Sequence, residues 1–105
     1  MYAVIFEVEV KEEGKEMYLA IAGKLREQLV KMEGFISIER FESLVNEGKL
    51  LSLSFWESLE AIETWKANLE HMQAQQKGRG SLFKDYRIRV AKVEKDYTMA
   101  TSTLG

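Results

Sequence analysis

Residues 49–71 read KLLSLSFWESLEAIETWKANLEH, and their pattern changes from that of a strand to that of a helix near Ser58. Apolar and aromatic side chains dominate residues 49–56, which predicts a strand. Ser58 can cap a helix, and the acidic residues Glu57 and Glu60 suit the positive end of its dipole. The apolar positions that follow are spaced three or four residues apart: Leu59, Ile62, Trp65, Leu69 and Met72. The stretch therefore predicts a strand followed by an amphipathic helix.

The residues upstream predict a strand, a helix and a second strand. Residues 2–10 alternate between apolar and polar side chains, which is typical of a half-buried strand. Residues 15–32 predict a helix, and Gly34 follows as a left-handed stop. The apolar positions of that helix are Met17, Ile21, Leu25, Leu29 and Met32. Residues 35–44 are rich in aromatic and β-branched side chains and predict the next strand.

A turn and a last strand complete the order of elements. The turn is expected at Asn46-Glu47-Gly48, where Gly48 can take a positive φ without steric cost. Residues 83–94 alternate again and predict a fourth strand. The order strand-helix-strand-strand-helix-strand predicts an α+β fold of the ferredoxin-like kind. Such a fold has a four-stranded antiparallel sheet with both helices on one face.

Length and composition set limits on the class of protein. The 105 residues suit one domain, which we place at residues 1–96, followed by a polar tail at residues 97–105. The 15 basic and 17 acidic residues are interspersed, so we expect no nucleic-acid partner. The absence of cysteine and the single His71 predict no disulfide and no metal site. The apolar N-terminus is interrupted by Glu7 and Glu9, so we expect a cytoplasmic protein without a membrane span.

The two faces of the predicted sheet differ in polarity. The more apolar set is expected to meet the helices: Val4, Phe6, Val8, Ile36, Ile38, Leu51, Leu53, Phe55, Tyr86, Ile88 and Val90. The other set is mixed, with Ala3, Ile5, Phe35, Phe41, Leu50, Trp56, Ala91 and Val93 beside Glu7, Glu39, Arg87 and Arg89. Monomers rarely leave so many large apolar side chains in water, so the mixed face predicts a homodimer formed by sheet pairing. The alternative is a half-solvated sheet, which antiparallel sheets allow.

Residues 55–71 resemble the central signature of the antibiotic biosynthesis monooxygenase family. In that family a strand ends in Trp-Glu-Ser, here Trp56-Glu57-Ser58, and the next helix carries a second Trp with a His six residues later, here Trp65 and His71. Glu33-Gly34-Phe35 and Asp85-Tyr86-Arg87-Ile88 resemble the flanking blocks, so the resemblance covers residues 1–94. It implies ferredoxin-like subunits that pair their sheets into a dimeric α+β barrel, with a pocket between helices and sheet.

The resemblance further implies a cofactor-independent monooxygenase that acts with dioxygen on a small aromatic or quinol substrate. His71 is the candidate catalytic base because its ordinary pKa lies at about 6.5. The alternative, which the lack of a partner for a lone His favours, is a surface or interface residue near a helix C-terminus, where its charge complements the dipole. Trp65 could line the pocket or simply pack in the core. Asn68 and Arg87 are candidate donors to a substrate oxygen. Glu7 is expected to pair with Arg87 or Arg89.

A haem cofactor is disfavoured. The haem-degrading members of the family place an axial His about ten residues after the helix Trp, and Gln75 occupies that position here. Gln75 cannot ligate haem iron as an imidazole does, so haem binding would require His71 instead. We therefore expect no cofactor. The remaining alternative is a dimer that binds a small ligand without turnover, since one fold can carry many functions.

Overall fold

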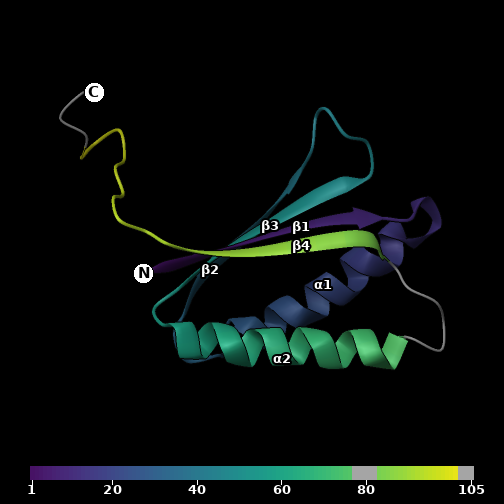
Figure 1. The fold of residues 1–105 in the computed structure, drawn as a ribbon, viewed down its shortest axis with the longest axis horizontal. Coiled ribbons are helices and arrows are strands. Elements are labelled where there is room, and N and C mark those ends of the chain that lie inside the picture. The colour runs from purple at the N-terminus through teal and green to yellow at the C-terminus, as the bar shows by residue number, and fades with distance from the viewer. Residues whose placement is uncertain (77–82, 102–105) are drawn as a thin grey trace.

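Four strands and two helices follow one another in the order β-α-β-β-α-β in the computed structural model (Figure 1). The structure describes residues 1–76 and 83–101, and for residues 71–76 it describes the helical backbone only. The elements are β1 (Tyr2–Val10), η1 (Glu12–Gly14), α1 (Lys15–Leu29), β2 (Phe35–Glu42), β3 (Lys49–Trp56), α2 (Leu59–Gln76) and β4 (Phe83–Lys92). This is the ferredoxin-like α+β fold that the sequence predicts. Neither described helix is long and apolar enough to cross a membrane.

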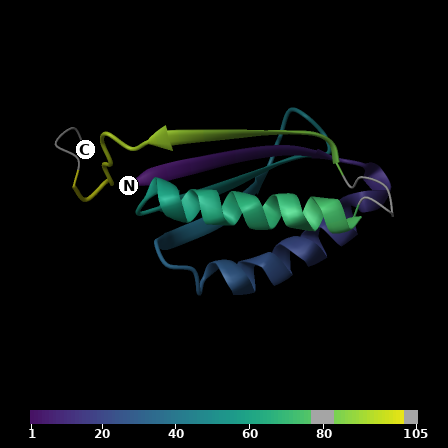
Figure 2. The same ribbon diagram turned by 60° about the horizontal axis from the view of Figure 1, so that its bottom comes forward.

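The sheet has the strand order β2-β3-β1-β4, with every neighbouring pair antiparallel. Both helices lie on the same side of it (Figure 2). We call that side the helix-facing side and the other the open face. The open face carries Ala3, Ile5 and Glu7 of β1, Leu51, Leu53 and Phe55 of β3, Arg87, Arg89 and Ala91 of β4, and Ser37, Glu39 and Phe41 of β2.

The joint between β3 and α2 is fixed by Ser58 and Gly34. The Ala61 backbone N–H donates to Ser58 Oγ at 3.2 Å, which confirms the predicted helix cap. Gly34 has φ +85°, the left-handed conformation predicted for it. A Cβ atom on Gly34 would lie 2.8 Å from Ala61 Cβ. Glycine is therefore required here by the backbone conformation and by the close approach of α2.

The core fills the space between the sheet and the helices. Val4 and Val8 of β1 and Trp56 of β3 are fully buried, and Leu29 of α1 and Ile62 of α2 are each 2% exposed. Each large apolar side chain that is fully buried contributes roughly 1.5–3 kcal/mol, so the packing of the sheet against the helices supplies much of the folding free energy. The core therefore depends on β1 and β3, which occupy the centre of the sheet.

The predicted orientation of β3 is wrong. Leu51, Leu53 and Phe55 point to the open face, where they are only half-buried. The buried positions of β3 are Leu50, Ser52, Ser54 and Trp56. In this register the small Ser52 and Ser54 lie opposite Phe6 and Val4, which leaves room between sheet and helices for large rings. The more polar set of side chains thus faces the core because it accommodates Trp56.

The predicted orientation at the start of β2 is also wrong. The register shifts between Phe35 and Ser37, which makes Ile36 the extra residue of a bulge. Ile36 is consequently 45% exposed. Phe35 and Ile38 pack against the core instead.

Helix α1 ends at Leu29, three residues before the predicted end, and its buried face differs from the predicted one. Met17 is 46% exposed, whereas Tyr18, Ala22 and Leu29 are buried. The chain then leaves the helix in tight turns, with the Met32 backbone N–H donating to the Leu29 carbonyl at 3.0 Å. The helix is therefore rotated so that the ring of Tyr18, rather than Met17, reaches the sheet.

Candidate functional site

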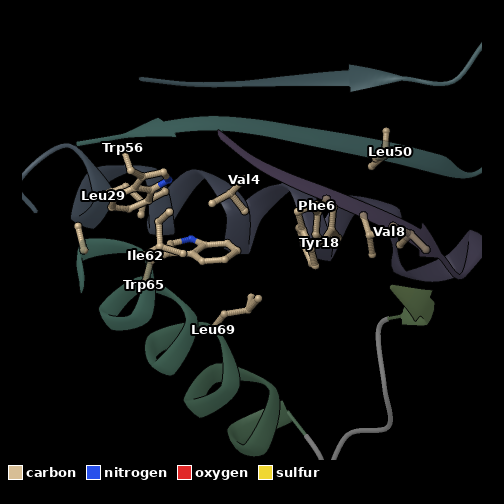
Figure 3. Close-up of a cluster of buried hydrophobic side chains, with 12 residues drawn as sticks. Val4, Phe6, Val8, Tyr18, Leu29, Leu50, Trp56, Ile62, Trp65 and Leu69 are labelled. Carbon is tan, nitrogen blue, oxygen red and sulfur yellow. The ribbon is translucent and has the colours of Figure 1, made fainter. Parts of the chain in front are cut away.

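Aromatic rings line the interior between the sheet and the helices. Trp65 of α2 is 5% exposed, and its ring meets Phe6 edge-on at a centroid distance of 6.1 Å. Its ring centroid also lies 6.4 Å from that of Trp56. Figure 3 shows the two indole rings with Ile62 and Leu29. Trp56 in turn meets Phe35 edge-on at 5.3 Å. The two edge-to-face contacts, of Phe6 with Trp65 and of Phe35 with Trp56, have a favourable geometry for aromatic pairs.

A second branch of rings continues from Phe6 toward β4 and α1. Phe6 lies 5.7 Å from Tyr86 and 6.4 Å from Phe83, both on β4. Phe83 meets Tyr18 of α1 edge-on at 5.6 Å. The interior thus offers apolar, aromatic walls from all four strands and both helices, which is the environment that a flat aromatic molecule prefers.

Few polar groups enter this interior, and those of β3 are hydrogen-bonded or small. The indole N–H of Trp56 donates to Ser54 Oγ at 2.9 Å. Ser52 and Ser54 are 4% and 1% exposed. Pairing the indole with a buried hydroxyl removes the cost of burying both groups without partners.

Tyr18 and Arg40 form a polar contact beneath α1 that sequence reasoning missed. The guanidinium of Arg40 donates from Nη2 to the Ala22 carbonyl at 3.4 Å. Burial raises the pKa of the Tyr18 hydroxyl, although the charge of Arg40 and a hydrogen bond from it oppose that rise. The signal in the sequence was an arginine two positions after Ile38, on the side of β2 that faces the core.

The open face carries a charged hollow of about 280 Å³. Its lining comes from three strands: Glu7, Val8, Glu9, Lys49, Asp85, Tyr86 and Arg87. The Glu7 carboxylate accepts a hydrogen bond from Arg89 Nη1 at 2.9 Å and lies 3.8 Å from Lys49 Nζ. The predicted pairing of Glu7 with Arg87 or Arg89 is therefore made with Arg89.

The structure separates the predicted site residues. Trp65 is packed in the core, and Asn68 is exposed on the outer side of α2. Arg87 lies opposite Glu7 on the open face, on the other side of the sheet from Trp65. His71 and Gln75 fall in the part of α2 whose side chains lie outside the described residues. Their predicted roles in proton transfer and in the exclusion of haem stay predictions.

Metal ligands do not gather in the described part of the chain. Among the side chains of residues 1–70 and 83–101, no three His, Cys, Asp or Glu side chains are close enough to hold a metal ion.

Comparisons with known proteins agree on one family. The family model described as "Antibiotic biosynthesis monooxygenase" matches residues 1–77. "Jasmonate monooxygenase ABM" of Pyricularia oryzae is 41% identical over 93 residues, which cover 89% of this chain but only 43% of that protein. The chain thus spans less than half the length of that relative. "Uncharacterized protein YqjZ" of Bacillus subtilis is 32% identical, with 97% of this chain and 87% of that protein covered.

Solved structures share the fold at low sequence identity. A structure described as a putative antibiotic biosynthesis monooxygenase from Deinococcus radiodurans superposes with a TM-score of 0.77 at 16% identity, over 94% of this chain and 98% of that one. The structure of a single-residue variant of SnoaB, described as a cofactor-independent oxygenase from Streptomyces nogalater, superposes with a TM-score of 0.72 at 11% identity. The superposition covers 90% of this chain and 94% of that one. At such identities these likenesses support the fold rather than a reaction.

Proposed function

Because the chain belongs to the antibiotic biosynthesis monooxygenase family, we propose that it is a monooxygenase that acts on a small aromatic or quinol substrate without a bound cofactor. The observation that carries the proposal is the family match together with the aromatic interior around Trp65 and Phe6. The relative from Pyricularia oryzae, named a jasmonate monooxygenase, supports the reaction class. The fold is compatible with a reaction that needs no cofactor, since SnoaB, which shares it, is described as a cofactor-independent oxygenase.

In such a reaction the substrate itself supplies the electrons. A phenol or quinol loses a proton, and the electron-rich anion transfers electrons to dioxygen. One oxygen atom enters the ring to give a quinone and the other leaves as water, so a phenol with an unsubstituted para carbon plus O₂ gives a p-quinone plus H₂O. The protein must therefore supply an apolar binding surface, a proton acceptor and donors to the developing anion.

We assign these roles, as part of the same proposal, to the residues chosen from the sequence. Trp65 provides a wall for the substrate ring, which its buried position next to Phe6 supports. His71 accepts the phenolic proton, since its ordinary pKa of about 6.5 leaves most of it neutral at pH 7. Asn68, which is exposed on the same helix, is a secondary donor. Arg87 lies across the sheet from Trp65, so we assign it no role at this substrate.

Oxygen consumption tests the proposed reaction. With 1,4-naphthohydroquinone, the protein is expected to consume oxygen faster than the uncatalysed autoxidation measured with catalase and superoxide dismutase present. One atom of ¹⁸O₂ should appear in the product and the other in water. His71→Ala should lose this activity at an unchanged melting temperature, whereas Lys66→Ala, an exposed change on the same helix, should keep it. Equal rates with and without protein would refute the proposed reaction, and an active His71→Ala would refute the role of His71.

We also propose that two copies pair through the open face. Ile5, Leu51, Leu53 and Phe55 are only half-buried in the single chain, and Phe41 is 43% exposed. A patch of this kind is larger than a monomer usually leaves in water, and a second copy of the same surface would cover it. Light scattering at micromolar concentration is expected to give twice the 12.1 kDa mass of one chain. A single-chain mass would contradict the pairing.

A further inference from the structure

Arg40 places a positive charge on the helix-facing side of the sheet, where the surroundings are mostly apolar. It lies on the edge strand β2, opposite Ser52 of β3 and partly buried beneath α1. Glu42, which lies on the same face of β2, pairs with Lys15 at 3.2 Å instead. Over the described part of the chain, Arg40 has no carboxylate partner.

The hydrogen bonds of the Arg40 guanidinium are incomplete. The contact from Nη2 to the Ala22 carbonyl is long at 3.4 Å, and the guanidinium also lies near the Tyr18 hydroxyl, where its charge opposes the rise in the pKa of that group. The Nε atom is buried, and no acceptor for it is found among the described residues. Buried donors without an acceptor are rare in folded proteins. An arginine whose Nε–H and neighbouring N–H are both available can bind a carboxylate or another anionic oxygen with two bonds.

Tyr18 adds a second donor at the same place. The Tyr18 hydroxyl lies near the Arg40 guanidinium and can itself donate a hydrogen bond to a ligand oxygen. The Tyr18 ring meets Phe83 edge-on at 5.6 Å, and Phe83 lies 6.4 Å from Phe6. A cationic donor and a neutral donor thus stand beside aromatic walls, which is the arrangement expected for an aromatic ligand with one anionic oxygen.

We infer that Arg40 and Tyr18 bind an anionic oxygen, a carboxylate or a phenolate, of an aromatic ligand beneath α1. This inference rests on the proposed function, because we take the ligand to be the substrate of the proposed reaction. It narrows the substrate class to acidic aromatic molecules. Arg40 then orients the ligand by its charged oxygen, and its positive charge also favours the deprotonated form of a phenol.

The competing explanation is that Arg40 only ties α1 to β2. A structural tie would be expected to hold its donors in short, aligned bonds to the protein, and it would give no preference between a charged ligand and a neutral ligand of the same shape. The two explanations therefore differ in the binding of matched ligands.

Calorimetric titration with 2-naphthoate and 2-naphthamide measures that difference directly, because the two molecules share their shape and differ in charge. Wild-type protein is expected to bind 2-naphthoate at least about tenfold more tightly, as a charge-assisted bidentate contact predicts. Arg40→Gln should abolish the preference, and Tyr18→Phe should reduce it by several-fold. Arg26→Gln removes an exposed charge of α1 and should leave the preference unchanged.

Three results would overturn the inference: equal binding of the two ligands by the wild type, a preference that survives Arg40→Gln, or a preference that Arg26→Gln abolishes as well. If Arg40→Gln does not fold, Arg40→Lys replaces it, since lysine keeps the charge without the planar fork. If Arg40→Lys keeps the full preference for 2-naphthoate, that result would count against the inference. If Arg40→Lys loses most of the preference, that result would support the inference. The titration needs no turnover, so its outcome stands apart from that of the oxygen-consumption experiment.

Discussion

The helix-facing side and the open face of the sheet are built from alternate residues of the same strands, yet they differ in how completely they are covered. Trp56 is fully buried on the helix-facing side, while its neighbour Phe55 stays half-buried on the open face. Both strands at the centre, β1 and β3, show this alternation. The helices cover one face of the sheet and leave the apolar side chains of the other face half-exposed.

The polarity of the side chains does not account for this difference. On β3 the covered face carries Ser52 and Ser54, whereas the open face carries Leu51, Leu53 and Phe55. Small hydroxyl side chains make room for two indole rings and give Trp56 a hydrogen-bond acceptor. Size and hydrogen bonding thus select the covered face, and the larger apolar side chains of β3 are left on the open face.

Replacing either of the neighbours Trp56 and Phe55 with alanine tests the difference between the two faces of the sheet. This comparison has the largest expected effect on stability. Trp56→Ala should lower the free energy of unfolding by about 3–5 kcal/mol, because it leaves a cavity and strands the Ser54 hydroxyl. Phe55→Ala should cost about 1 kcal/mol at concentrations where the chain is a monomer, because its ring is only half-buried there. Urea denaturation measures both values.

Protein concentration separates the contribution of a second copy from that of the single chain. If two open faces pair, the cost of Phe55→Ala should grow as the concentration rises, whereas that of Trp56→Ala should change little. Equal losses in the free energy of unfolding for the two variants at low concentration would show that the two faces are covered equally, which would contradict the proposed difference between them.

Gly34→Ala tests how closely the helix-facing side is packed at the start of α2. We expect a loss of about 2–4 kcal/mol, because alanine is strained at φ +85° and its Cβ would lie 2.8 Å from Ala61 Cβ. Gly48→Ala is the matched control, with φ +82° but an ordinary 3.6 Å contact to the Val10 carbonyl oxygen. The control should cost only about 1–2 kcal/mol, for the backbone conformation. Similar losses in both variants would mean that the approach of α2 adds nothing.

The sequence predicts the elements of this fold well because most of their signals are local. The bounds of β1 and β3 and the start of α1 match the predictions, and the Ser58 cap and the two positive-φ glycines lie where turn and cap chemistry place them. Each of these features depends on residues within a few positions of one another. Alternation, capping and left-handed turns are therefore readable without knowledge of the tertiary structure.

The orientation of β3 and the contact between Tyr18 and Arg40 could not be predicted in the same way, since both depend on how distant parts of the chain pack together. Alternation shows that two sets of side chains lie on opposite faces, and it does not show which set meets the helices. Counting apolar residues favoured Leu53 over Ser54, and the bulge at Ile36 was invisible to the same count. Arg40 reaches Tyr18 across 22 positions of sequence, so only the packing of α1 on β2 brings them together.

The smallest expected effect concerns the ion pairs of the open face. Glu7 bonds Arg89 at 2.9 Å and lies 3.8 Å from Lys49, but all three side chains are at least 30% exposed. Glu7→Gln should therefore cost less than about 1 kcal/mol at low salt, and the cost should shrink further at 0.5 M salt. Glu70→Gln, which breaks the exposed pair with Lys66 at 3.9 Å on α2, should show the same behaviour.

The comparison of Glu7→Gln with Glu70→Gln sharpens the contrast between the two faces. The ion pairs lie at the end of the open face away from Phe55, beside the charged hollow, so we expect this end to stay in water even when two copies associate. A cost above about 3 kcal/mol that does not respond to salt would mean that Arg89 and Lys49 are left as unpaired charges in a dry interface. In that case the whole open face, and not only its apolar end, would be buried between the two chains.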